Sequence, residues 1–180
     1  MSPRPAIFFT VIFFILTPFY FLVDRPVPMQ NDLQEKQESL LKLSAIDAIT
    51  VTRGAETIHY QKTPDGKLFQ LTTPANAFIP QDLMQATAQL LMGAKSVEVV
   101  AENSNDAKQF GLDQPTAVML VQAPGQQKPI KITFGNENPT KTAIYAQIEG
   151  VPKIFLLGRS LEYYQDLMFQ WVEGKQGKNA

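Results

Sequence analysis

The first long feature in the pattern of apolar and polar residues is an unbroken apolar run near the N-terminus. Residues 6–23 are 18 residues without a charge, preceded by Arg4 and followed by Asp24 and Arg25. A helix needs about 20 apolar residues to cross the hydrocarbon core of a bilayer. The run therefore predicts one transmembrane helix, and its anchor positions include Ala6, Phe8, Phe13, Pro18, Tyr20 and Val23.

A cleaved secretory signal is the alternative interpretation of this run, because such a signal also has a basic start and an apolar core. However, the run is longer than the usual signal core of about 7 to 15 residues. Residues 22–28 offer no pair of small residues for a peptidase, and the absence of cysteine excludes lipoprotein processing. We therefore favour an uncleaved anchor. The basic residue on the short N-terminal side favours a cytoplasmic N-terminus, with the rest of the chain periplasmic or lumenal.

After the anchor, the pattern changes to a polar linker and then to short alternating segments. Residues 32–43 are mostly polar with a thin stripe of leucines, which predicts a short juxtamembrane helix that packs on its own domain. The expected organisation is an anchor at residues 1–25, a linker and helix at 26–44, one domain at 45–173 and a flexible tail at 174–180.

Short segments with alternating or β-branched residues predict the strands of this domain. Turn signals rich in proline and glycine separate them, of which Pro64-Asp65-Gly66 is the strongest. We expect residues 97–100 to form a buried strand. The predicted strands are residues 46–53, 57–62, 68–72, 97–100, 118–122, 130–134, 143–148 and 153–157.

Helical periodicity marks two longer segments. Residues 81–92 place Met84, Thr87, Ala88 and Leu91 on one face, and a second helix begins at a Ser160 cap. A shorter helix is expected from a Ser104 cap to Gly111. The fold class is therefore α+β, with a mostly antiparallel meandering sheet, or sheets, and two main covering helices.

Charge and composition exclude several classes of function. Beyond residue 25 the chain has 14 basic and 16 acidic residues, so it lacks the positive charge that phosphate binding needs, and we expect no nucleic-acid partner. No lysine-rich cluster follows the anchor, so anionic lipid recognition has no support. With no cysteine there is neither a disulfide nor thiolate chemistry.

Candidate catalytic and metal-binding residues are few. His59 is the single histidine, which rules out a histidine-based triad and a multi-histidine metal site. Residues 136–138 could offer oxygens to calcium, but a plain turn is favoured. Glu98 and Glu102 could act as paired carboxylates, although surface charge is the better interpretation. We therefore predict no catalytic, cofactor or metal site and a protein that is not an enzyme.

Aromatic residues of the closing helix are the remaining candidates. Tyr164 and Trp171 share the apolar face of this helix and are expected in the core. Tyr163 and Phe169 are expected off that face, where exposed aromatic side chains mark a contact surface. Tyr163 and Phe169 are thus the possible partner contacts.

Several motifs together resemble one known family. They are Phe110-Gly111-Leu112-Asp113-Gln114-Pro115, Phe134-Gly135-Asn136-Glu137-Asn138-Pro139, Ile144-Tyr145-Ala146 and Ile154-Phe155-Leu156-Leu157. This set is similar to the domain of unknown function 4340 (DUF4340) family over residues 43–172. Phe110 replaces a usual tyrosine, and Leu68-Phe69 follows the hairpin turn where many relatives have a tryptophan.

The resemblance implies a single-anchor envelope protein, often a neighbour of transporter components of the gliding-associated ABC type, with no established catalytic residue. We expect a non-enzymatic accessory or assembly protein whose periplasmic or lumenal domain docks on an integral membrane complex such as an ABC-type transporter. A thylakoid photosynthetic complex would serve equally as the partner. A ligand- or glycan-binding module displayed at the envelope is the alternative, and a hydrolase would need two carboxylates in one cleft.

Overall fold

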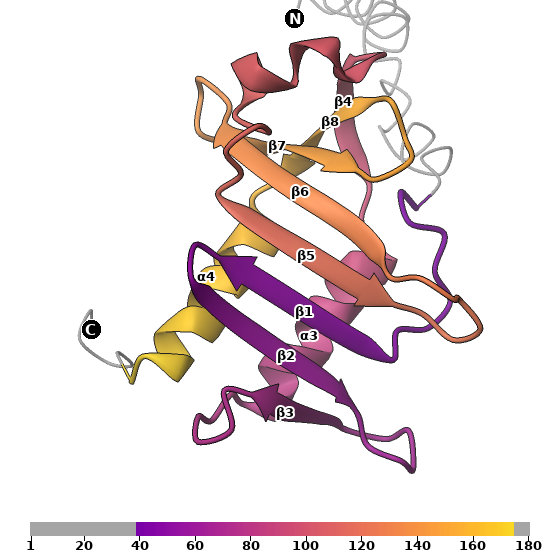
Figure 1. Ribbon diagram of the computed structural model, residues 1–180, viewed down its shortest axis with the longest axis vertical. Coiled ribbons are helices and arrows are strands. Elements are labelled where there is room, and N and C mark those ends of the chain that lie inside the picture. Colours follow the sequence, from indigo (N-terminus) through magenta and orange to yellow (C-terminus); the bar gives the residue numbers. More distant parts are fainter. Residues whose placement is uncertain (1–38, 175–180) are drawn as a thin grey trace, which may run out of the picture. The chain divides into compact units, whose positions relative to one another are not determined.

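One antiparallel sheet of eight strands organises the part of the chain that the computed structural model describes, residues 39–174 (Figure 1). Its order is β3-β2-β1-β5-β6-β7-β8-β4, and helices α3 (Gln81–Met92) and α4 (Ser160–Val172) pack on one face. The strands are β1 (Ala48–Arg53), β2 (Glu56–Lys62), β3 (Phe69–Thr73), β4 (Ser96–Ala101), β5 (Ala117–Gln122), β6 (Ile130–Glu137), β7 (Ala143–Ile148) and β8 (Ile154–Gly158). The predicted α+β class is confirmed, with a single sheet.

The predicted anchor and the six residues named in it lie outside the described residues, as does the tail after Gly174. Within residues 39–174, no helix combines the length and the apolar character needed to span a bilayer.

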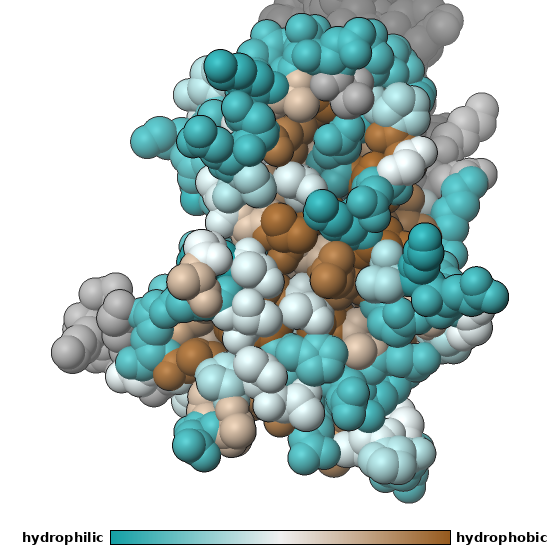
Figure 2. Space-filling view, in the orientation of Figure 1, coloured by the Kyte–Doolittle hydropathy of each residue, from teal (hydrophilic) through white to brown (hydrophobic). Residues whose placement is uncertain are grey.

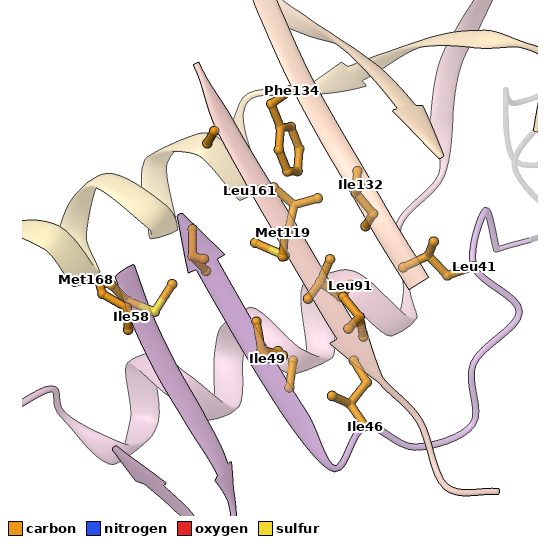
Figure 3. Close-up of a cluster of buried hydrophobic side chains, with 14 of the residues drawn as sticks. Leu41, Ile46, Ile49, Ile58, Leu91, Met119, Ile132, Phe134, Leu161 and Met168 are labelled. Atoms are coloured by element: carbon orange, nitrogen blue, oxygen red, sulfur yellow. The ribbon is translucent and has the colours of Figure 1, made fainter. Parts of the chain in front are cut away.

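Strand alternation places the core between the sheet and the helices. Ile49 and Val51 of β1, and Met119 and Val121 of β5, are fully buried on the helix side, whereas the residues between them are only half-buried on the opposite face. Burying each such side chain contributes about 1.5–3 kcal/mol. Figure 3 shows this cluster, including Ile49, Ile58, Met119, Ile132, Leu91, Leu161 and Met168.

The periodicity of α3 gives the stripe expected from the sequence. Met84, Thr87, Ala88 and Leu91 are buried, and the helix ends where the Gly93 N–H donates to the Gln89 carbonyl at 3.0 Å. In α4 the buried set is Leu161, Gln165, Met168 and Phe169, which differs from the predicted face. The α4 helix is therefore rotated about its axis relative to the expected orientation.

The sheet face opposite the helices is largely polar. Figure 2 views this face, where apolar residues gather in the middle of the sheet and polar residues surround them. Val118 and Leu120 of β5 are half-buried there. Beside them, Thr50 Oγ1 lies 2.8 Å from His59 Nδ1, so the single histidine forms a cross-strand hydrogen bond with its register partner.

Each edge of the sheet carries a local feature that hinders pairing with a further strand. At β3, the Gln81 side-chain amide can direct its nitrogen to the Phe69 carbonyl at 2.6 Å and its oxygen to the Phe69 N–H at 2.7 Å. These are the bonds a ninth strand would make. At β4, the pairing with β8 contains two register irregularities, and such bulges hinder association along an edge.

Three expectations about individual segments were wrong. The predicted buried strand at 97–100 is the exposed edge strand β4, in which Val97 is 61% exposed. Apolar content alone does not reveal that a strand has a neighbour on only one side. The side chain that caps the short 3₁₀ helix (Ser104–Phe110) is that of Asn103, and Arg159 precedes α4 without a side-chain cap bond.

The expected juxtamembrane helix is also wrong for its described part, because residues 39–43 are not helical. The Leu40 N–H donates to the Ala94 carbonyl at 2.7 Å, Ser39 Oγ donates to the Met92 carbonyl at 2.6 Å, and Leu41 is buried in the core. Hydrogen bonds to the carbonyl groups at the end of α3 take the place of the hydrogen bonds within a helix. The expected packing of Leu40 and Leu41 on their own domain is confirmed.

Tyr60 of β2 is a polar group in the middle of the core. Its side chain is fully buried, and its hydroxyl makes no well-formed hydrogen bond within the described structure. Burial raises the pKa of this phenol above its ordinary value, and the nearby Thr87 hydroxyl offsets only part of the effect. The folded state therefore keeps the phenol neutral.

We predict that Tyr60→Phe changes the free energy of unfolding at neutral pH by less than about 1 kcal/mol, because the hydroxyl has no good partner to lose. In the unfolded chain tyrosine titrates near pH 10, so wild-type stability should fall above that pH by up to about 1.4 kcal/mol per unit. The free energy of unfolding of the variant should decrease less steeply with pH above pH 10. Urea unfolding at a series of pH values measures both effects. An equally steep decrease in the variant would contradict a raised pKa of the Tyr60 phenol.

Candidate functional site

Three of the four motifs that carry the family resemblance come from separate segments and meet at one end of β6. The 3₁₀ helix ends at Gly111 in the left-handed conformation (φ 73°), where a Cβ would lie 2.5 Å from the Asn136 side chain. A Cβ on Gly135 would lie 2.1 Å from the Phe110 carbonyl oxygen. The two glycines therefore allow two backbone segments to approach more closely than any side chain permits.

Aromatic and polar contacts complete this motif cluster, which consists of residues 110–116, 134–138 and Tyr145. The Phe110 and Tyr145 ring centroids are 4.7 Å apart. Thr116 Oγ1 donates to the Phe134 and Gly135 carbonyls at 3.2 and 3.0 Å. These motif residues therefore join the end of the 3₁₀ helix to strands β6 and β7.

Asn138 orders the turn that follows β6. Its Oδ1 accepts from the Thr142 and Ala143 N–H groups at 2.9 and 3.1 Å, and its Nδ2 donates to Thr140 Oγ1 at 2.9 Å. These side-chain atoms are engaged in the turn, which favours the turn over the calcium alternative for residues 136–138. Among residues 39–174, no three acidic or histidine side chains gather as a metal site.

A small polar pocket lies next to the motif cluster, under the first half of α4. Its cavity is about 140 Å³, and Thr116 and Phe134 belong to both features. Gln165 is 2% exposed, and its Nε2 has no hydrogen-bond partner within the described structure. The residues that line the pocket are Arg53, Thr116, Ala117, Phe134, Ile144, Glu162, Gln165 and Asp166.

Arginines neutralise the carboxylates around this pocket. Arg53 from β1 forms an ion pair with Asp166. Arg159 bridges Glu137 at 2.8 Å and Glu162 at 2.9 Å, and its hydrogen bond to Glu162 raises the pKa of its guanidinium. With the acids paired in this way, the pocket holds no free carboxylate pair for acid–base catalysis.

The other paired carboxylates considered from the sequence are on the surface. Glu98 is exposed on the edge strand β4, and Glu102 forms an exposed ion pair with Lys153 at 2.9 Å. Their arrangement agrees with surface charge rather than with a catalytic pair.

The division of the α4 aromatic residues into buried and exposed side chains differs from the expectation. Phe169 is 2% exposed, and the Arg53 guanidinium carbon lies 4.6 Å above its ring centroid. The prediction that Phe169 lies off the buried face is therefore wrong, because the rotation of α4 directs it to the sheet and beneath an arginine from β1. Tyr163 is 60% exposed, as expected, and its role in partner contact stays a prediction.

Sequence reasoning missed a second exposed aromatic residue. Phe78, in the loop before α3, is 66% exposed, and its ring centroid lies 5.7 Å from that of the half-buried Trp171. The only signal in the sequence was a phenylalanine within a loop between two prolines, at residues 74–80. This signal does not distinguish a buried loop anchor from an exposed side chain.

Comparison with known proteins now decides the family. The family described as "Domain of unknown function (DUF4340)" matches residues 69–175. The chain belongs to the DUF4340 family. No curated protein and no solved structure matches the chain.

The match to DUF4340 covers the motif cluster, both helices and the strands from β3 to β8. It starts later than the resemblance read from the sequence, which began at residue 43. Strands β1 and β2 lie outside the match, although β1 pairs with β5 in the middle of the sheet.

We predict that Gly135→Ala destabilises the domain by about 3 kcal/mol, since its Cβ would meet the Phe110 backbone oxygen rather than a flexible side chain. Gly158→Ala is the matched control, because nothing lies within 4 Å of a Cβ at that position. The control should change the free energy of unfolding by less than about 0.5 kcal/mol. Equal stabilities of the two variants in chemical denaturation would refute the close approach.

A second pair of variants tests the orientation of α4. Phe169→Ala should cost about 3–5 kcal/mol of stability, as expected for a buried phenylalanine. Tyr163→Ser removes an exposed ring and should cost less than about 1 kcal/mol. Thermal unfolding followed by circular dichroism separates the two, and a reversed order would show that the helix presents the other face to the sheet.

Proposed function

We propose that this protein is a non-enzymatic, membrane-anchored accessory or assembly protein whose domain docks on an integral membrane complex such as an ABC-type transporter. The observation that carries the docking role is the exposure of Phe78 and Tyr163 on a domain whose other aromatic side chains are largely packed. Large exposed aromatic residues are typical of the centres of protein interfaces. The uncharged run at residues 6–23 supports attachment to the membrane.

The polar pocket supports a structural interpretation better than a catalytic one. Its acidic side chains pair with arginines, and its buried donor belongs to an amide, which does not act as a general base. We therefore assign no reaction to this site.

The partner is a membrane complex of the envelope, or alternatively a thylakoid photosynthetic complex.

The ligand- or glycan-binding alternative needs a larger cavity. Pockets for organic ligands usually measure about 300–1,000 Å³. Three cavities formed by described residues measure about 180, 170 and 140 Å³, at the end of α3, beside the β2–β3 hairpin and under α4. Each of these cavities is smaller than a usual pocket for an organic ligand, which supports a docking role over ligand or glycan binding.

We predict that the full-length protein stays in the membrane fraction after a wash with about 1 M salt, which screens ionic contacts beyond a few ångströms. Mild-detergent purification should then recover an integral membrane protein in a stoichiometric amount. The control is a variant that lacks residues 1–25, which should be released from the membrane. A full-length chain that washes off with salt, or that purifies alone from several detergents, contradicts the proposal.

A further inference from the structure

The polar pocket under α4 contains a buried hydrogen-bond donor that the surrounding residues do not satisfy. Gln165 lines this pocket and is 2% exposed, and its Nε2 has no hydrogen-bond partner within the described structure. An unpaired buried donor destabilises the folded state, because its hydrogen bonds to water are lost without compensation. The donor is therefore available to an acceptor that comes from outside the domain.

The ionised groups of the pocket already have partners within the protein. Arg53 pairs with Asp166, and Glu162 pairs with Arg159 at 2.9 Å. An entering carboxylate would face two carboxylates, whereas an entering ammonium would face the Arg53 guanidinium and the donor of Gln165. Either ion would lose its hydration without gaining a free counter-charge. These contacts therefore favour a neutral occupant.

A carboxamide matches the hydrogen-bonding groups and the size of the pocket. Its oxygen can accept from Gln165 Nε2, and its NH₂ group can donate to Glu162 or Asp166, because an ionised carboxylate has about four acceptor sites and an ion pair uses only some of them. The cavity of about 140 Å³ also exceeds the roughly 10–15 Å³ that one water molecule needs. The pocket therefore has room for a small polar side chain.

This pocket reaches the surface beside an exposed aromatic residue. The Arg53 and Asp166 side chains that line it are 36% and 43% exposed. Tyr163 precedes Asp166 by three residues in α4, so the two side chains are neighbours on the helix surface, and Tyr163 is exposed. Tyrosine, arginine and pockets that a partner side chain fills are typical of the energetic centres of protein interfaces. The location therefore suits insertion of a side chain from a docked protein.

We infer that this pocket binds the carboxamide of an asparagine or glutamine side chain of the docking partner, with Gln165 as the hydrogen-bond donor. The inference rests on the proposed function, in which the partner is an integral membrane complex. It gives a role to a buried amide that weakens the fold of the free protein. Residues that lower the stability of the free protein are expected at functional sites.

The side-chain amide resonances of Gln165 report directly on the occupant of the pocket. In isotope-labelled full-length protein in neutral detergent, the variant Gln165→Met identifies these resonances by their loss. Acetamide should shift them saturably, with the weak affinity expected for so small a molecule. Acetate, methylammonium and isopropanol are the matched probes for an anion, a cation and a hydroxyl. No saturable shift with acetamide, or an equal shift with any of the other three, would overturn the inference.

Stability and partner binding should respond differently to Gln165→Met. Methionine nearly keeps the volume of glutamine and removes the unpaired donor, so the variant should unfold at the same or a higher urea concentration than the wild type. It should nevertheless recover at least several-fold less of the membrane partner in mild detergent. Ala117→Val narrows the pocket and keeps Gln165, so it should lower recovery as well. Gln61→Met, at an exposed position of β2, is the matched control and should change neither property.

The outcomes of these experiments distinguish the inference from the proposed function. Recovery of the partner at the wild-type level by Gln165→Met retains the proposed function and overturns the inferred pocket. A Gln165→Met variant that is clearly less stable than the wild type would show that the fold already satisfies the amide, which also overturns the inference. A wild-type protein that purifies without a partner contradicts both, even if acetamide binds.

Discussion

The pairing of β1 with β5 is the contact on which the rest of the described structure depends. It joins residues about 70 positions apart, Ile49 with Val121 and Val51 with Met119, in register. Without it the strands form two separate groups, β1–β3 and β4–β8, and the buried residues of the two groups no longer line one continuous face. With it, α3 and α4 share one apolar face of the sheet, and Thr87 and Tyr60 enter the same core.

This pairing also determines what the helix layer presents to its surroundings. Because β1 lies in the middle of the sheet, its last residue, Arg53, reaches α4, where it covers Phe169 and pairs with Asp166. Phe169 is thereby removed from the surface, whereas Tyr163, two turns earlier on the other side of the helix, stays exposed. The exposure of Tyr163 is thus a consequence of how α4 is rotated against the sheet.

The DUF4340 motifs of this chain form a structural junction between the 3₁₀ helix and β6. Their glycines permit the close approach of the 3₁₀ helix to β6, and Asn138 and Thr116 satisfy backbone groups around it. The exposed aromatic residues Phe78 and Tyr163 lie outside these motifs.

The sequence by itself determined the α+β class, the helix at residues 81–92 with its buried stripe, the approximate ranges of the strands and the left-handed end of the 3₁₀ helix at Gly111. These features depend on local periodicity and on backbone preferences that act within a few residues. Only the tertiary structure decided that β4 is an edge strand, that Phe169 is buried and Phe78 exposed, and that Gln165 lines a pocket with Arg53. Such properties depend on which distant segment packs against a residue, and the pattern of apolar positions says that a face is buried without saying by what.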